Sequence, residues 1–171
     1  LSDILGSVCG LPATGSQDLG GDLETVLTAF TEDDAALEFV SGRTDIDRVA
    51  VVGHSAGGGA ATAAADLPGV RIVIPMGGGG STDAANLDMA LYLGGIDDTV
   101  VPFSQIRSAY EQSDVPRRLV GIDGGAHLIF SDICELTNDA GRDLVEIATE
   151  AGVCGTQFAS FLFDCAASRI P

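Results

Sequence analysis

The stretch VAVVGHSAGGGAA, from Val49 to Ala61, decides the fold. It opens with a short apolar run, which is typical of a β-strand buried on both faces. A glycine ends that run, and His54 and Ser55 then lie before an Ala- and Gly-rich stretch that predicts a helix. The pattern predicts a sharp strand–turn–helix connection that carries one hydroxyl group at the turn.

The turn itself, GHSAG, matches the motif G-x-S-x-G in the strand–turn–helix context that the motif requires. In such a turn the serine takes a strained backbone conformation. We expect glycine to be required at positions 53 and 57, because a Cβ atom at either position would collide across the turn. We also expect Gly58 and Gly59 to let the helix lie close to the sheet. The serine is therefore interpreted as a nucleophile, with an incidental serine in a Gly-rich turn as the alternative.

A serine nucleophile needs a base, and the chain contains two histidines. His54 is adjacent to Ser55 inside the turn, so its side chain cannot easily reach the serine Oγ. His127, in the stretch DGGAHLIFSD after a predicted strand, is our candidate base, with a purely structural histidine as the alternative. We expect the backbone N–H of Ala56, at the helix N-terminus, to donate to a developing oxyanion.

The histidine in turn needs a carboxylate that fixes its tautomer. The stretch YLGGIDDTVVPF offers Asp97 and Asp98. We choose Asp98, because Pro102 then closes a D-x-x-x-P loop ahead of a helix, and we treat Asp97 as a solvated loop acid or turn cap. Asp123 is a more distant candidate. The chain order Ser, Asp, His is that of the α/β-hydrolase version of the triad.

Predicted strands and helices alternate along the chain. Apolar runs predict strands at residues 49–53, 70–75, 89–95 and 117–123. Helical patterns cover residues 21–30, 56–66, 103–112, 128–136 and 141–152, with 35–40 as a candidate extension of the first helix. This alternation is typical of a mostly parallel sheet with helices on both faces. We predict one partial catalytic domain over residues 1–171, with a Cys-containing helical tail from about residue 133.

From about Asp22 to Asp132 the chain resembles the catalytic half of an α/β-hydrolase. More narrowly, it is similar to the dienelactone-hydrolase-like and bacterial cutinase-like (polyester hydrolase) branch. The matching pieces are DIDRVAVVGHSAGGGAA, IVIPM, LYLGGIDDTVVP and GIDGGAHLIFSD. The resemblance implies a serine esterase that forms an acyl-enzyme on Ser55, with His127 as base, Asp98 as acid and no metal or cofactor.

Two departures from these families narrow the expected substrate. Dienelactone hydrolases use a cysteine nucleophile, where this chain has Ser55, so that substrate is disfavoured. Cutinase-like enzymes carry a tryptophan after the strand that matches IVIPM, whereas this chain has no Trp and places MGGGG there, so we do not expect polyester hydrolysis. Met76 is a candidate wall of an open acyl pocket, with a core methionine as the alternative.

We therefore expect hydrolysis of small to medium acyl esters. Amide or peptide hydrolysis on the same triad stays open. The alternative from another class is a non-catalytic α/β-hydrolase-like fragment or binding module. Covalent labelling of Ser55 by a fluorophosphonate distinguishes an active serine hydrolase from such a module.

The charge balance excludes some partners. Asp and Glu total 25 against 8 basic residues, all of them Arg, and the formal net charge is −17. Such a chain is unsuited to nucleic-acid phosphates or to an anionic membrane surface. No apolar run approaches the roughly 20 residues that a membrane-spanning helix needs. We expect a small-molecule ester as the ligand and a solvated acidic surface around it.

Four cysteines, without any C-x-x-C pair, point to export rather than to a zinc site. We predict a secreted or extracytoplasmic protein with at least one disulfide among Cys134, Cys154 and Cys165, while Cys9 lies near the start of the sequence. Buried free thiols are the alternative. The sequence does not choose among the pairings.

A second oxyanion donor normally comes from a loop after an earlier strand. The residues before Ser55 contain a helix and turns but no convincing buried strand. We therefore expect the strand at 49–53 to have an open hydrogen-bonding edge. A partner chain or a missing N-terminal segment would then complete the sheet.

Overall fold

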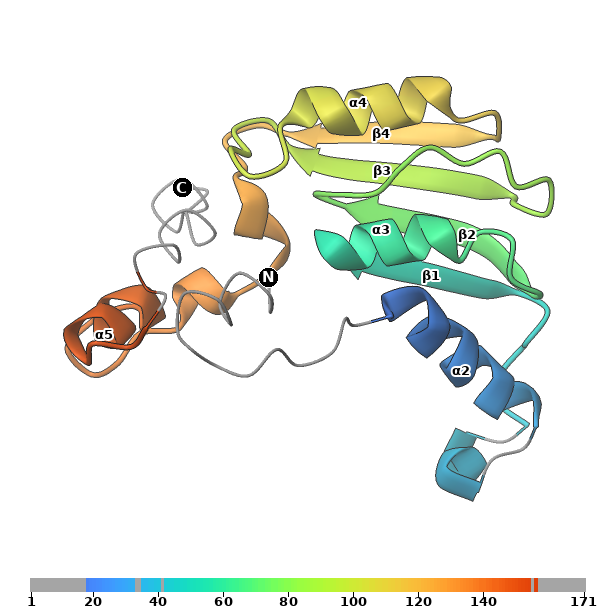
Figure 1. The fold of residues 1–171 in the computed structure, drawn as a ribbon, viewed down its shortest axis with the longest axis horizontal. Helices are drawn as coiled ribbons and strands as arrows, with labels where there is room; N and C mark the ends of the chain where they lie inside the picture. Colours follow the sequence, from blue (N-terminus) through green and yellow to red (C-terminus); the bar gives the residue numbers. More distant parts are fainter. Residues whose placement is uncertain (1–17, 33–34, 41, 155, 157–171) are drawn as a thin grey trace.

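A four-stranded parallel sheet in the order β1-β2-β3-β4 lies at the centre of the protein (Figure 1). The structure is a computed structural model that describes residues 18–32, 35–40, 42–154 and 156. The strands are β1 (Val49–His54), β2 (Val70–Met76), β3 (Met89–Gly95) and β4 (Arg117–Ile122). Each agrees with its predicted range to within one residue, which confirms the predicted α/β class.

Helices connect β1 to β2 and β3 to β4, a loop connects β2 to β3, and helices cover one face of this sheet. They are α2 (Leu19–Thr31), α3 (Ala56–Ala63) and α4 (Phe103–Gln112), while α5 (Leu144–Glu150) lies away from the sheet (Figure 1). The residues of β2 and β3 that face α3 and α4, such as Val73 and Tyr92, are fully buried. Because this layer of the core is so tightly packed, it holds the ends of the strands in fixed positions.

Four predicted helical segments are shorter or more broken than expected, and the one at 141–152 is α5, Leu144–Glu150. Helix α3 ends at Ala63 and gives way to a turn, in which the N–H groups of Ala65 and Leu67 bond to carbonyls only three residues back. Residues 35–40 form a separate 3₁₀ helix, η1 (Ala35–Val40). The predicted helix at 128–136 is instead two 3₁₀ helices, η2 (His127–Phe130) and η3 (Ile133–Glu135), because Ser131 between them is extended, with φ −139° and ψ 148°.

The second face of the sheet is more open than the sequence predicts. Val51 of β1 points toward the helices and is buried, whereas Val52 points the other way and is 52% exposed. On the same face of β4, Val120 is 44% exposed. The prediction that β1 is buried on both faces is therefore wrong, because β1 is an edge strand and the described helices lie on the other side. Helices on the second face stay a prediction.

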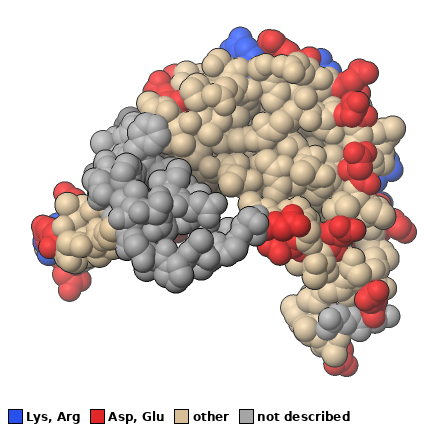
Figure 2. Space-filling view, in the orientation of Figure 1, with Lys and Arg blue, Asp and Glu red and all other residues tan. Residues whose placement is uncertain are grey.

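Acidic side chains are spread around the periphery of the face shown in Figure 2, and the centre of that face, over α3 and α4, carries few charges. This distribution fits a solvated acidic surface on that face. None of the helices in the described ranges is long and apolar enough to cross a membrane. The side chains of Cys9, Cys134 and Cys165 lie outside the described residues, so the disulfide stays a prediction.

Candidate active site

Ser55 lies at a strained turn between β1 and α3. Its φ of 56° and ψ of −118° make it the one non-glycine residue with a positive φ in the described part of the chain. Its N–H donates to the carbonyl of Met76 at 2.8 Å, and its own carbonyl accepts the N–H of Gly58 at 2.9 Å. Such strain persists only where surrounding contacts impose it, and it holds the serine side chain at the carboxyl ends of the strands.

Two of the four predicted glycine roles in this turn are confirmed. A Cβ at Gly53 would lie 1.9 Å from the carbonyl oxygen of Gly57, and a Cβ at Gly58 would lie 3.1 Å from the backbone of Gly78. A Cβ at Gly57 or at Gly59 would meet nothing within 4 Å. The predicted need for glycine is therefore wrong at those two positions, because their open sides face away from the strand and from the loop after it.

Ser55, His127 and Asp98 form a continuous chain of hydrogen bonds. The Nε2 atom of His127 lies 2.9 Å from the Oγ atom of Ser55, and its Nδ1 atom lies 2.8 Å from an Asp98 carboxylate oxygen. Asp98 and His127 are 5% and 3% exposed. Because a carboxylate only accepts, Nδ1 carries the proton and the lone pair of Nε2 faces the serine hydroxyl.

The structure distinguishes the three candidate acids. The second carboxylate oxygen of Asp98 accepts the N–H groups of Val100 and Val101, each at 2.8 Å. These bonds orient the buried carboxylate toward the imidazole. Asp97 and Asp123 are exposed, and neither is the carboxylate that bonds Nδ1 of His127. The tight loop after β3 therefore presents one of its two adjacent aspartates to the histidine and the other to solvent.

Ala56 and Met76 both lie beside Ser55. Ala56 is the first residue of α3, where the first N–H groups of a helix have no partner within it. The N–H groups of Gly58 and Gly59 both reach the Ser55 carbonyl, which leaves those of Ala56 and Gly57 at the open end of the helix. Met76 ends β2, is half-buried and pairs with His54 in the parallel register.

His54 makes a contact that the sequence did not predict. Its Nε2 atom lies 2.8 Å from the backbone carbonyl oxygen of His127, 73 residues further along the chain. Burial is the main cause of a lowered pKa for the His54 imidazole. The serine hydroxyl bonds His127 and not His54, in agreement with the expectation that His54 is not the base. The His54 side chain instead contacts the segment that carries His127. Adjacency to Ser55 was the one signal available in sequence.

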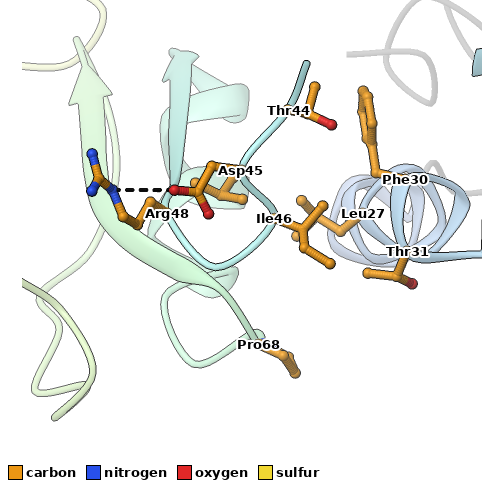
Figure 3. A pocket seen from close by; sticks show the side chains of 9 residues that line it. Leu27, Phe30, Thr31, Thr44, Asp45, Ile46, Arg48 and Pro68 are labelled. Carbon is orange, nitrogen blue, oxygen red and sulfur yellow. Dashed lines mark ion pairs between the residues drawn. The ribbon is translucent and has the colours of Figure 1, made fainter. Parts of the chain in front are cut away.

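Other candidate sites are less organised. No cluster of His, Cys, Asp and Glu with the geometry to hold a metal ion occurs within the ranges that the structure describes. A pocket of about 290 Å³ lies between α2 and the amino ends of β1 and β2 (Figure 3). It is lined by Leu27, Phe30, Thr31, Thr44, Asp45, Ile46, Arg48, Val49 and Pro68. It is therefore at the opposite end of the strands from Ser55.

Comparisons with known proteins identify the fold. No protein-family model and no curated protein sequence matches the chain. Among solved structures, it is similar to MGS-M1, an α/β hydrolase enzyme from a Medee basin deep-sea metagenome library. The identity is 19% over 89% of this chain and 67% of that one, with a TM-score of 0.51.

Two further solved structures match with lower TM-scores. One is an alpha-beta serine hydrolase homologue from Coxiella burnetii, with 24% identity over 69% of this chain and 56% of that chain, and a TM-score of 0.45. The other is the esterase domain of a Rhodothermus marinus protein, with 17% identity over 82% and 68%, and a TM-score of 0.43. The chain thus spans little more than half the length of the Coxiella protein.

The parallel strand order and the likeness to MGS-M1 define the chain as an α/β-hydrolase-type fold. The chain places its serine turn, its aspartate and its histidine after β1, β3 and β4, at the carboxyl ends of the strands, where ligands bind in such sheets. The dienelactone-hydrolase-like and cutinase-like branch stays a prediction.

Proposed function

We propose that this protein is a serine hydrolase that cleaves carboxylic esters of small to medium acyl groups through an acyl-enzyme. One observation carries the proposal: the buried chain of hydrogen bonds from Asp98 through His127 to Ser55, with the serine held at a strained turn. Buried polar groups of this kind destabilise a fold unless they are fully paired, and their arrangement here is the one that activates a serine hydroxyl.

In the first half of the reaction, Nε2 of His127 takes the proton of Ser55 as Oγ attacks the ester carbonyl carbon. The carbonyl oxygen becomes an oxyanion in a tetrahedral intermediate. When this collapses, the bond to the alcohol oxygen breaks, and the imidazolium returns its proton to the departing alkoxide. The products are the free alcohol and an ester of Ser55.

In the second half, a water molecule attacks the acyl-enzyme while His127 takes a proton from it. The bond from the acyl carbon to Oγ of Ser55 then breaks, and the proton returns to the serine. The carboxylic acid leaves. Asp98 stays ionised throughout, holds the tautomer of His127 and stabilises the imidazolium.

We assign the backbone N–H of Ala56 as one oxyanion donor, because it lies next to the nucleophile at the open N-terminus of α3. The described residues before β1 contain α2 and η1 and no strand that would supply the second donor. We propose that further chain, from a preceding segment or a partner, pairs with β1. The support is that β1 is the edge strand of the described sheet.

The substrate class rests on the sequence resemblance and on the surroundings of Ser55. We propose Met76 as part of the acyl-binding wall, since its backbone contacts Ser55 and its side chain is half-buried. The glycine-rich loop that follows adds little bulk. Comparison of kcat/KM for p-nitrophenyl acetate, butyrate and octanoate, and for the matching anilides, separates ester from amide hydrolysis and gives the acyl length.

Export to an oxidising compartment also stays a proposal, supported by the four cysteines. Mass spectrometry after alkylation without reductant tests it. Incomplete alkylation is expected, and four alkylated thiols would contradict the predicted disulfide.

A fluorophosphonate probe tests the central proposal. We expect stoichiometric labelling of wild-type protein at Ser55 and none of Ser55→Ala. Ser104→Ala is the matched control, because Ser104 is an exposed serine on α4, and it should label like the wild type. Well-folded wild-type protein that takes up no probe would favour the non-catalytic binding module instead.

A further inference from the structure

His54 occupies the last position of β1, directly before the strained serine. Successive side chains of a strand point to opposite faces. Gly53 faces α3, so the imidazole of His54 lies on the other face, toward the segment after β4. Its Nε2 atom is 2.8 Å from the carbonyl oxygen of His127. A carbonyl only accepts, so Nε2 of His54 carries the proton and donates.

The partly buried His54 ring is contacted by two other rings. Its centroid lies 4.7 Å from that of the His127 ring and 5.6 Å from that of Phe130. On another side is Gly77, with φ +54°, where a Cβ would lie 3.3 Å from Nε2 of His54 and 3.5 Å from Nδ1 of His127. The fold therefore brings both imidazoles against a residue without a side chain, and the His54 ring has little freedom to turn away.

The segment that carries His127 is held at Gly125, whose carbonyl accepts the N–H of Asp97, and the bond from His54 holds it again at His127 itself. Two glycines precede it closely, and Gly124 has a φ of +69°, so the approach to the histidine has high intrinsic backbone freedom. Asp98 bonds the ring of His127, but a ring can be held while the backbone beneath it shifts. The bond from His54 is made to the backbone itself.

A neutral His54 is compatible with the positive charge that His127 takes on during hydrolysis. Burial lowers its pKa, so the ring is neutral at pH 7. During hydrolysis His127 becomes an imidazolium whose centre is 4.7 Å from the His54 ring. A neutral donor leaves that charge undisturbed, whereas a second cation at this distance would oppose it.

We propose that His54 is a positioning residue: its Nε2–H holds the backbone of His127 so that the imidazole meets the Ser55 hydroxyl. This inference rests on the proposed serine-hydrolase function and adds a fourth side chain to it. His54 does not exchange a proton with Ser55, and it acts through His127 alone.

Amide variants of matched chemistry test the proposal. The Nε2 atom of a glutamine can take the place of the imidazole Nε2, while an asparagine is one methylene shorter and stops short of the carbonyl. We expect His54→Asn and His54→Leu to lower kcat for p-nitrophenyl butyrate by about 10- to 100-fold with little change in KM. We expect His54→Gln to stay within about 3-fold of the wild type, because it keeps a hydrogen-bond donor. Circular dichroism checks folding, and the Asn–Gln pair decides the matter if the Leu variant unfolds.

A second measurement separates positioning through His127 from any direct role. In a His127→Ala background, His54→Asn should cause no further loss of residual activity, because there is no imidazole left to position. An equal additional loss in that background would overturn the proposal, as would a His54→Asn enzyme with wild-type kcat. Failure of wild-type protein to react with the fluorophosphonate is a different result: it removes the hydrolase function, and the positioning role with it.

Discussion

The two ends of the parallel sheet are built differently. At the carboxyl ends of the strands lie a strained serine, a buried aspartate–histidine pair and a glycine loop packed against them. At the amino ends lies the pocket of Figure 3, whose ion pair between Arg48 and Asp45 has side chains 81% and 58% exposed. Both ends bring an Asp side chain against a basic or imidazole side chain, so composition alone does not distinguish them.

The two ends differ in how far their charged side chains are removed from water. A carboxylate that is nearly inaccessible to water interacts strongly with its few partners, so Asp98 fixes the orientation of His127. An exposed pair such as Arg48 and Asp45 is screened by solvent and contributes little. The comparison teaches that reactive geometry is found where polar groups are both buried and fully paired, and the predictions below test each part of that statement.

The largest effect is expected from removing the nucleophile or the base. Ser55→Ala and His127→Ala should each lower ester turnover by at least about 10⁴-fold, and the double variant should be little worse, because triad members act as a unit. Arg48→Ala, at the amino-end pocket, should change turnover less than about 2-fold, since it alters an exposed ion pair. Steady-state kinetics with p-nitrophenyl butyrate measure all four. Equal losses at the two ends would contradict the assignment of the site.

The next effect separates two adjacent aspartates. Asp98→Asn should lower kcat by about 10³- to 10⁴-fold, because a neutral amide no longer selects the tautomer of His127. Asp97→Asn should leave kcat within about 2-fold, since its side chain is exposed. Thermal melting of both variants shows whether folding is retained. The reverse ranking would show that the loop after β3 presents the other carboxylate.

A third prediction concerns the glycines of the serine turn. Gly53→Ala should lower the free energy of unfolding by about 3 kcal/mol or more, because its Cβ would lie 1.9 Å from the Gly57 carbonyl oxygen. Gly57→Ala should change it by less than about 1 kcal/mol, since a Cβ there meets nothing within 4 Å and alanine favours helix. Urea unfolding of the two variants provides the measurement. Equal stability would mean that the turn relaxes around the added methyl group.

The smallest effect is a pH dependence from His54. Burial lowers its pKa below the ordinary value of 6.5, so the unfolded chain binds its proton more readily than the folded protein does. Its contribution to stability is therefore complete above about pH 6.5 and declines as the pH falls below that value. We expect the stability difference between wild type and His54→Gln to be less favourable to the wild type at pH 5 than at pH 8, measured by urea unfolding. A difference independent of pH would contradict the lowered pKa.

Local pattern determined most of what could be predicted about this chain. Short segments rich in Val, Ile and Leu predicted the four strands to within one residue, because such residues favour extended backbone. The motif GHSAG also predicted the strained turn at Ser55, because the residues that allow this backbone conformation lie within the motif itself. The prediction that glycine is required failed at Gly57 and Gly59, where a Cβ would meet nothing within 4 Å, because the space around these positions depends on how the helix packs.

The sequence named Ser55, Asp98 and His127 as candidates, and only the tertiary structure decided the contacts that hold them together. Asp97 and Asp98 are adjacent and chemically identical, and the choice between them depends on the two N–H groups of Val100 and Val101 that turn one carboxylate inward. The bond from His54 to His127 joins residues 73 apart in the chain, and the exposure of Val52 on β1 depends on which face of the sheet the described helices cover. Local patterns carry the preferences of the backbone, whereas contacts between distant segments depend on how whole elements pack, which a single stretch of sequence does not encode.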